Sequence, residues 1–265
     1  MISTPMYFPD GFDLELAKLC ARLSSYAYDM YTQWTKQGKP RKERGFRWTP
    51  PSDAGLTFSA PFWSAEEVLW VFNEAEPFGF CARDRAGTGY LVFRRTSSNS
   101  DWADDADVDQ RPYDLVPNYG QVHDGFLKLY TSMRADVLDE LDSVGPISDL
   151  RVTGHSLGCG LATLAVPELV GRPGAGSITQ YNFASPRVGN PDFAAAYNSN
   201  GVPTFRVVNT CDLVPEVPPS VLAKLVFKHV GAPIDFTAQY GAVGGDHSLD
   251  GAYRYALDNP GAPQS

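Results

Sequence analysis

The spacing of apolar side chains along this chain first predicts helices. Between residues 13 and 28, and again between 124 and 144, apolar positions recur every three or four residues, which is typical of amphipathic helices. A basic stretch with proline and glycine, residues 36–53, follows the first helix and predicts a solvated loop. The apolar faces comprise Leu16, Leu19, Cys20, Leu23 and Ala27 in the first helix, and Phe126, Leu129, Met133, Val137 and Leu141 in the second.

Shorter apolar runs predict strands and, with them, the class of fold. A polar turn at residues 84–89 joins two such runs and predicts a hairpin. After residue 148 strands and helices alternate, which favours an α/β fold whose central sheet is mixed but mostly parallel and flanked by helices. We therefore expect a single domain over residues 1–265, with residues 1–64 as an N-terminal extension of helix and loop. The expected strands are 67–74, 78–84, 88–96, 149–153, 177–186 and 204–210, and the later helices are 161–170 and 191–199.

Composition excludes several classes of function. The 265 residues suffice for one large core or two small ones, and 43% of them are hydrophobic, as in ordinary globular proteins. The formal net charge is −9, so no nucleic-acid partner is expected, because such proteins usually carry a basic surface. Anionic membranes would repel this chain, so any lipid contact has to be apolar. No segment approaches the ~20 consecutive apolar residues of a membrane span.

The cysteines and the first residues add little. The four cysteines have no metal-binding spacing, and Cys159 and Cys211 are expected to be small buried side chains. Whether Cys20 and Cys81 pair stays open. The first fifteen residues lack the basic start and apolar core of a Sec signal, so a cytoplasmic location is the expectation from sequence.

The candidate chemistry begins at the sequence GHSLG, residues 154–158, which we call the elbow. It follows an apolar strand-like run and opens a helix of small residues, the setting in which a sharp turn exposes a nucleophilic serine. Gly154 and Gly158 lack a Cβ and would relieve the crowding of such a turn. Ser156 is therefore the candidate nucleophile, and the alternative is a serine that merely caps a buried helix.

A serine hydroxyl is a weak nucleophile and needs a base. Of the four histidines, His155 lies inside the elbow and is expected to point away from the serine, while His123 and His229 are interpreted as structural. His247 follows a glycine-rich loop that can bring it over Ser156, so it is the best candidate for the base.

The base in turn needs a carboxylate that orients it. In the chain order typical of α/β-hydrolases this acid lies between the serine and the histidine. Asp212 ends a strand-like run and would share the rim of the sheet with Ser156. Asp235 and Asp246 are its rivals, although Asp246 is adjacent to His247, where an orienting contact is awkward.

Several motifs together resemble a known family. Besides GHSLG they are VHDGF (122–126), FASPRVGN (183–190), FRVVNTCDLVPEVP (205–218) and DHSLDGAY (246–253). In this order they are similar to the class 3 lipases, which comprise the fungal-type triacylglycerol lipases and their bacterial and plant relatives. The resemblance covers about residues 65–257. It implies an α/β-hydrolase-type fold and the same triad of Ser156, Asp212 and His247.

The resemblance also implies an oxyanion hole and a lid. Thr96 of the sequence FRRT would match the residue that supplies a backbone N–H and a hydroxyl, and the N–H of Leu157 would be the second donor. Arg95 stands where the family commonly has glycine. Residues 97–110 would match the lid, with Trp102 on its inner face and Asp105 holding the oxyanion hydroxyl. A solvated acidic loop is the alternative for this segment.

The expected activity follows from these residues. The resemblance implies a serine hydrolase that cleaves carboxylic esters of acyl glycerols through an acyl-enzyme, with no metal or organic cofactor. Its partners would be a lipid or small ester substrate and, transiently, a lipid interface, and secretion is compatible with such an activity. The alternatives are a phospholipase A1 or feruloyl-type esterase with the same triad, or a binding protein that keeps the fold without catalysis.

Overall fold

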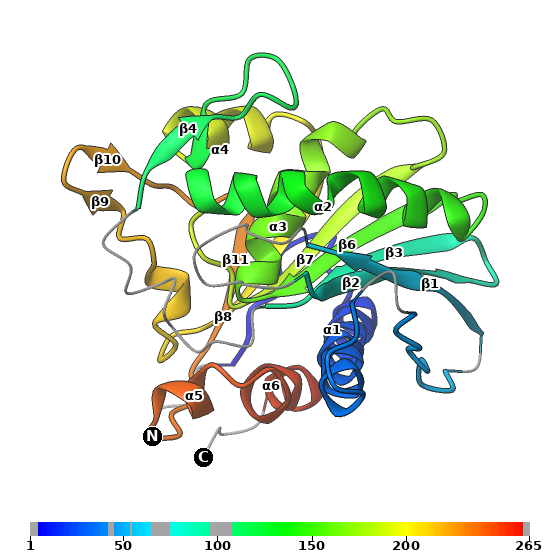
Figure 1. Ribbon diagram of the computed structural model, residues 1–265. Coiled ribbons are helices and arrows are strands. Elements are labelled where there is room, and N and C mark those ends of the chain that lie inside the picture. The colour runs from blue at the N-terminus through cyan, green and yellow to red at the C-terminus, as the bar shows by residue number, and fades with distance from the viewer. Residues whose placement is uncertain (1–4, 42–44, 54, 65–74, 96–107, 262–265) are drawn as a thin grey trace.

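A seven-stranded sheet forms the centre of the molecule (Figure 1). The computed structural model describes residues 5–41, 45–53, 55–64, 75–95 and 108–261. Strand β2 is antiparallel to both of its neighbours, whereas β3, β6, β7, β8 and β11 are mutually parallel, so the predicted mixed, mostly parallel sheet is confirmed. Across the sheet the strands are β1 (Leu56–Trp63), β2 (Pro77–Asp84), β3 (Thr88–Phe93), β6 (Asp149–His155), β7 (Ser177–Phe183), β8 (Thr204–Asn209) and β11 (Ala232–Phe236).

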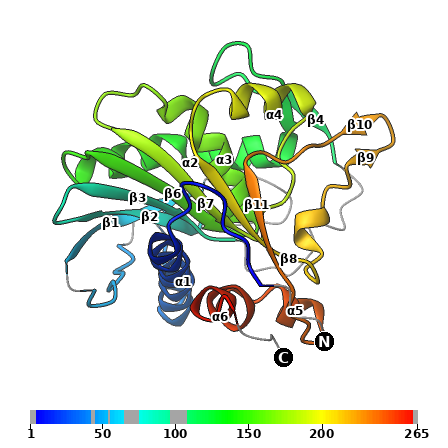
Figure 2. The same cartoon turned by 180° about the vertical axis from the view of Figure 1, so that it is seen from behind.

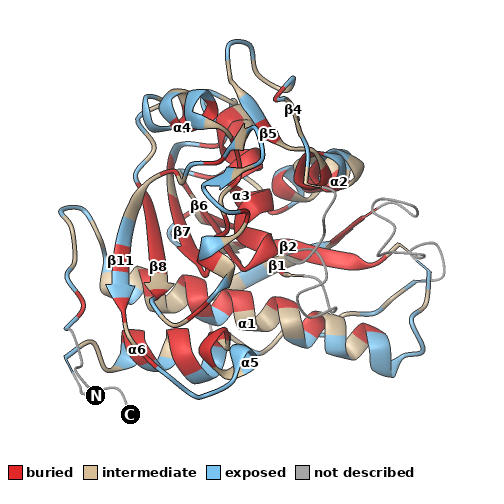
Figure 3. Ribbon diagram, turned by 90° about the vertical axis from the view of Figure 1, so that its left-hand side faces the viewer, coloured by how far each residue is buried: buried red, intermediate tan, exposed pale blue. Residues whose placement is uncertain are grey.

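Helices cover both faces of this sheet (Figures 1 and 2). One face carries α2 (Asp124–Ser143), α3 (Leu157–Leu169) and α4 (Pro191–Asn198). The other carries α1 (Leu14–Lys36), the π-helical turn η3 (Leu249–Arg254) and α6 (Tyr255–Asp258). Buried residues line the sheet and the helix sides that face it (Figure 3). The smaller elements are the hairpins β4 (Gln110–Pro112) with β5 (Gln121–His123) and β9 (Val221–Leu222) with β10 (Leu225–Val226), the turn η2 (Val214–Glu216) and α5 (Val243–Asp246).

The predicted elements of the C-terminal half agree with the structure to within a few residues, and the N-terminal half differs more. Helix α1 continues to Lys36, beyond the predicted end at residue 28, and the edge strand β1 was not predicted. Residues 1–64 thus supply a helix that packs on β2, β3 and β6 and a strand of the sheet itself. The predicted strand 67–74 lies outside the described residues. The single-domain organisation stays a prediction.

The cysteine questions are answered by burial. Cys20 and Cys81 are both free and fully buried, on opposite sides of the sheet, so they do not pair. Cys159 is a buried thiol, as predicted, but Cys211 is only half-buried because it lies in the turn after β8. Burial raises the pKa of the Cys20 thiol to about 12. Within the described ranges, no helix has both the length and the apolar character needed to cross a membrane.

The elbow between β6 and α3 is a sharp turn, since α3 begins two residues after β6 ends. Ser156 has a φ of 60° and a ψ of −129°, a combination that costs a non-glycine residue free energy. A Cβ on Gly154 would lie 2.4 Å from the carbonyl carbon of Gly158, and a Cβ on Gly158 would lie 2.5 Å from the carbonyl oxygen of Phe93. The predicted crowding is therefore confirmed, and it extends to the end of β3.

Helix α2 begins with a histidine cap. The Nδ1 atom of His123 accepts a hydrogen bond of 3.4 Å from the backbone N–H of Phe126, and the two rings stack with centroids 4.2 Å apart. Burial lowers the pKa of His123 to about 4, although the charges of Asp124 and Asp109 act in the opposite direction. His123 is therefore a structural, neutral histidine, as the sequence predicts.

Gly158→Ala should destabilise the protein by about 1–3 kcal/mol, because the added methyl group meets rigid backbone rather than a movable side chain. Urea denaturation at pH 7 measures this change. Gly261→Ala is the matched control, since a Cβ there has no heavy atom within 4 Å, and its effect should stay within about 0.5 kcal/mol. Equal stability of Gly158→Ala and the wild type would contradict the close approach of α3 to β3.

The His123 cap should make stability depend on pH. An unfolded histidine has a pKa of about 6.5, so between about pH 6.5 and pH 4 the unfolded chain binds a proton that the folded chain does not. Folding stability attributable to this group therefore falls with falling pH, by about 1 kcal/mol per pH unit. His123→Asn keeps a cap acceptor but does not titrate. Its stability, measured from pH 7 to pH 4, should fall less steeply than that of the wild type, and parallel curves would contradict the cap's role.

Candidate active site

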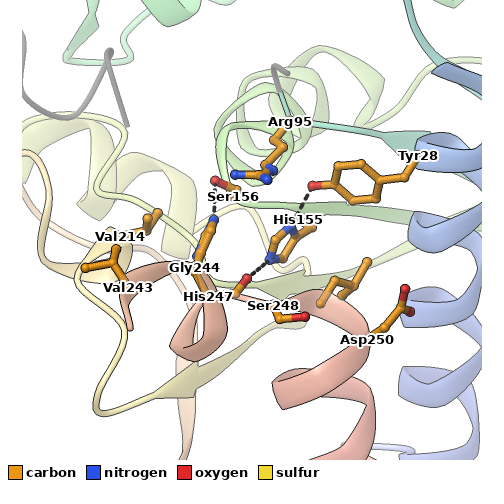
Figure 4. Close-up of a pocket in the computed structure, with 11 residues that line it drawn as sticks. Tyr28, Arg95, His155, Ser156, Val214, Val243, Gly244, His247, Ser248 and Asp250 are labelled. Atoms are coloured by element: carbon orange, nitrogen blue, oxygen red, sulfur yellow. Dashed lines mark hydrogen bonds between the residues drawn. The ribbon is translucent and has the colours of Figure 1, made fainter. Parts of the chain in front are cut away.

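The structure brings the three residues of the predicted triad into contact (Figure 4). Ser156 follows β6 and Asp212 follows β8, so both lie at the carboxyl edge of the parallel strands, and His247 follows α5. The Nε2 atom of His247 lies 2.9 Å from Ser156 Oγ, and its Nδ1 atom lies 2.7 Å from Asp212 Oδ2. All three residues are at most 6% exposed.

The hydrogen-bond pattern determines where the protons are. A carboxylate only accepts, so Nδ1 of His247 donates to Asp212. In the neutral ring Nε2 is then an acceptor, and the hydroxyl of Ser156 donates to it. This is the tautomer that a general base for the serine requires.

Asp212 accepts two further hydrogen bonds that hold its carboxylate in place. Its Oδ1 atom accepts from the backbone N–H of Val214 at 2.9 Å, and its Oδ2 atom also accepts from the hydroxyl of Tyr253 at 2.7 Å. Burial, followed by the negative charge of Asp212, raises the pKa of Tyr253 far above its usual range, so the phenol stays protonated and donates. A buried carboxylate with three donors is stable as an anion without a paired cation.

Asn209 joins the loops that carry the acid and the base. Its side-chain amide donates to the carbonyl groups of Asp246 and Ala238, both at 2.8 Å, and its Oδ1 atom accepts from the N–H groups of Cys211 and Ala238. It is fully buried at the end of β8. This amide therefore helps to set the separation between Asp212 and His247, together with the hydrogen bond between them.

The remaining histidine of the elbow is part of the site, which the sequence did not predict. The His155 ring is directed to Tyr28 rather than to the serine, but it stacks on the His247 ring with centroids 4.6 Å apart. Its Nε2 atom donates to the backbone carbonyl of His247 at 3.1 Å, so its Nδ1 atom accepts from the Tyr28 hydroxyl at 2.6 Å. Burial, and then the neighbouring charges of His247 and Arg95, holds the pKa of His155 well below 6.5.

The rival residues serve other purposes. Asp235 lies on the exposed side of β11. Asp246 is buried, but its Oδ1 atom accepts from the backbone N–H of Tyr240 at 2.6 Å and so closes the loop before the base. His229 donates from Nε2 to the carbonyl of Pro215 at 2.9 Å, and burial lowers its pKa to about 3.

A pocket of about 420 Å³ opens at Ser156 and His247. Apolar side chains from three segments form part of its wall, with Arg95 and Tyr28 on the side of β3 and α1 (Figure 4). Among the described residues, no three His, Cys, Asp or Glu side chains are grouped so that they could hold a metal ion. The apolar residues of the wall are Val214, Val243 and Leu249.

The candidate oxyanion residues are described only in part. Leu157 is buried at the first position of α3, where backbone N–H groups have no partner within the helix. Thr96 lies outside the described residues, as do Trp102 and Asp105 of the predicted lid. The chain just before Thr96 is held by Arg94, which is 1% exposed, pairs with Glu76 at 2.6 Å and donates to the carbonyl groups of Pro77 and Arg95.

Sequence reasoning missed Tyr28, Asn209 and Tyr253. Tyr28 comes from an amphipathic helix in which it looks like one more aromatic residue of the apolar side. Tyr253 and Asn209 belong to the motifs DHSLDGAY and FRVVNTCDLVPEVP, so their place beside the predicted triad residues was the available signal.

Comparison with known proteins agrees with this geometry. The family profile described as Lipase (class 3) matches residues 90–222, which is half of the chain. A lipase from Rhizomucor miehei is 37% identical over 156 residues, covering 56% of this chain and 41% of that protein. Phospholipase A1-II 3 from Oryza sativa subsp. japonica is 30% identical over 255 residues, covering 81% of this chain and 60% of that protein. The chain thus spans less than two thirds of the length of these curated relatives.

A solved structure extends the similarity to the fold. A triacylglycerol lipase whose catalytic centre is described as a serine protease triad superposes with a TM-score of 0.64, at 26% identity, over 87% of this chain and 82% of that one. This likeness confirms the α/β-hydrolase-type fold predicted from the sequence. Because the family profile and the fold agree with the order of the motifs, the chain belongs to the class 3 lipase family.

Proposed function

We propose that this protein is a serine hydrolase that cleaves carboxylic esters of acyl glycerols through an acyl-enzyme intermediate. The observation that carries the proposal is the hydrogen-bonded series Ser156–His247–Asp212 at the wall of a partly apolar pocket. The lipase from R. miehei, aligned over 56% of this chain, supports the same reading of the substrate.

The reaction follows from the positions of the protons. Ser156 Oγ attacks the ester carbonyl while its proton moves to Nε2 of His247, and Asp212 stabilises the resulting imidazolium. His247 then gives this proton to the departing alcohol. In a second round water attacks the acyl-enzyme while His247 takes its proton, and as the bond between the acyl carbon and Ser156 Oγ breaks, His247 returns this proton to Oγ.

The oxyanion donors are part of the proposal. The N–H of Leu157 is at the positive end of α3, which favours negative charge on the carbonyl oxygen. The second donor would be Thr96, on the basis of the sequence FRRT. Each such donor typically contributes about 10²- to 10³-fold to the rate.

We further propose transient contact with a lipid interface. Exposed apolar side chains come from the segments that flank the pocket: Leu213 is 60% exposed beside Val214, and Val243 is 56% exposed. Transfer of such surface to lipid is favourable by about 25 cal/mol per Å². Trp102 and Asp105 would belong to a lid over the same region.

A phospholipase A1 activity is the second candidate. The rice phospholipase A1 aligns with 81% of this chain, a larger share than the lipase from R. miehei. The same triad would act on the ester, and only the recognition of the head group would differ.

Ser156→Ala should lower kcat by about 10⁴- to 10⁶-fold on 4-nitrophenyl butyrate and on emulsified tributyrin, because no other group can form the acyl-enzyme. Ser199→Ala, at an exposed serine after α4, is the matched control and should keep full activity. A folded Ser156→Ala protein with more than a tenth of wild-type activity would refute the proposed function. A wild-type protein that cleaves no ester at all would favour the non-catalytic alternative.

Tyr253→Phe should lower kcat by about tenfold with little change in KM, because Asp212 loses one of its three donors while the pocket keeps its shape. Steady-state kinetics on a soluble ester separates the two constants. Tyr255→Phe, two residues later and 42% exposed, is the control and should behave as the wild type. Equal kcat values for the two variants would show that the Tyr253 hydroxyl does not position the acid.

A further inference from the structure

Arg95 introduces a cation into the pocket of the nucleophile. It occupies the position at which the resemblance leads one to expect glycine, immediately before Thr96. Both Arg95 and Ser156 line the pocket, and in Figure 4 the guanidinium of Arg95 extends toward the Ser156 side chain. A glycine here would leave that part of the wall without a side chain.

The backbone that carries this side chain is firmly held. The carbonyl oxygen of Arg95 accepts a hydrogen bond of 2.5 Å from the buried guanidinium of Arg94, which is itself paired with Glu76 at 2.6 Å. The side chain of Arg95 is also supported, because its guanidinium carbon lies 5.9 Å from the centre of the Tyr28 ring. Arg95 is therefore half-buried and held in place at the wall of the pocket.

The charge of Arg95 has no carboxylate partner among the residues that the structure describes. Asp250 is the other charged residue of the pocket wall, and it is paired with Arg254 at 2.8 Å and with the hydroxyl of Ser25. Burial raises the pKa of Tyr28, and the charge of Arg95 opposes this shift. Burial lowers the pKa of His155, and the charge of Arg95 adds to this shift. The charge of Arg95 therefore acts on residues of the site. A half-buried guanidinium at the wall of a pocket, with no carboxylate partner among the described residues, favours the binding of an anion there.

We propose that Arg95 selects esters that carry an anionic group, a phosphate or a carboxylate, within a few bonds of the scissile carbonyl. The planar guanidinium offers paired N–H donors that match two oxygens of such a group. Binding at Arg95 would hold the ester beside Ser156 Oγ. This inference rests on the proposed ester hydrolysis and names its substrate class.

Matched substrates test the phosphate. 1-Octanoylglycerol and 1-octanoylglycerol 3-phosphate present the same ester with and without the anion, and both are used as dissolved monomers. For the wild type, kcat/KM should be higher for the phosphate ester. In Arg95→Gln the ratio of the two kcat/KM values should fall by about 10- to 100-fold, the usual worth of hydrogen bonds to a charged group. Arg95→Lys should lose less, because it keeps the charge but not the paired donors.

A second pair of substrates tests the carboxylate. The mono-4-nitrophenyl ester of glutaric acid and 4-nitrophenyl valerate differ by a carboxylate on the acyl side. If the ratio of kcat/KM for the charged and the neutral ester falls in Arg95→Gln for just one of the two pairs, that pair shows which anion Arg95 binds and on which side of the ester. Added salt should reduce the preference of the wild type, since the guanidinium is partly exposed.

Arg172→Gln is the matched control, because it removes one positive charge beyond the opposite end of α3 from Ser156. It should keep the wild-type ratios. Unchanged ratios in Arg95→Gln would overturn the inference. An equal loss on charged and neutral esters would also overturn it, because Arg95 would then act on the carbonyl that all substrates share. Cleavage of the neutral esters alone would leave the proposed function intact while this inference fails, and cleavage of none would remove both.

Discussion

The close approach of helix α3 to the end of strand β3 is the constraint on which the site depends. It exists because Gly158 has no side chain, so that the helix backbone can lie against the carbonyl groups of Phe93 and Arg94. Ser156, two residues before Gly158, has unfavourable backbone angles, and the segment after β3 lines the same pocket. Nucleophile and adjoining pocket wall are thus fixed by one contact between backbones, which no side-chain rearrangement can loosen.

A second requirement is that the buried charge of Asp212 be matched by donors. A carboxylate removed from water is costly unless hydrogen bonds replace the solvent, and here three groups from three segments do so. Two of these donors, the N–H of Val214 and the hydroxyl of Tyr253, hold the carboxylate in the position in which it orients the third, His247. The carbonyl contact of His155 with His247, backed by Tyr28, adds a support from the far side of the ring.

The sequence predicts those parts of the site that depend on local rules. A serine between two glycines at a strand–helix junction, and an acid and a histidine in a set order after it, follow from chemistry that each short segment reveals. Tyr28 could not be found in this way. Its role arises because α1 crosses the sheet near β3 and β6, and nothing in the periodicity of an amphipathic helix says which aromatic residue reaches the elbow. The edge strand β1 was missed for a similar reason, since pairing with β2 outweighs its irregular burial pattern. Cys20 and Cys81 stay unpaired because the packing of α1 leaves them on opposite sides of the sheet.

The wide separation of the site residues along the chain has a consequence for synthesis. His247 follows Ser156 by 91 residues, and Tyr28 precedes both. A chain that folds from its N-terminus as it is made can form the elbow long before the base is available. Without that base the serine hydroxyl is a weak nucleophile. The complete arrangement therefore requires the segment that carries His247 and Tyr253, which packs on α1 and β8. A chain whose C-terminal segment has not yet docked would therefore lack the base that activates Ser156.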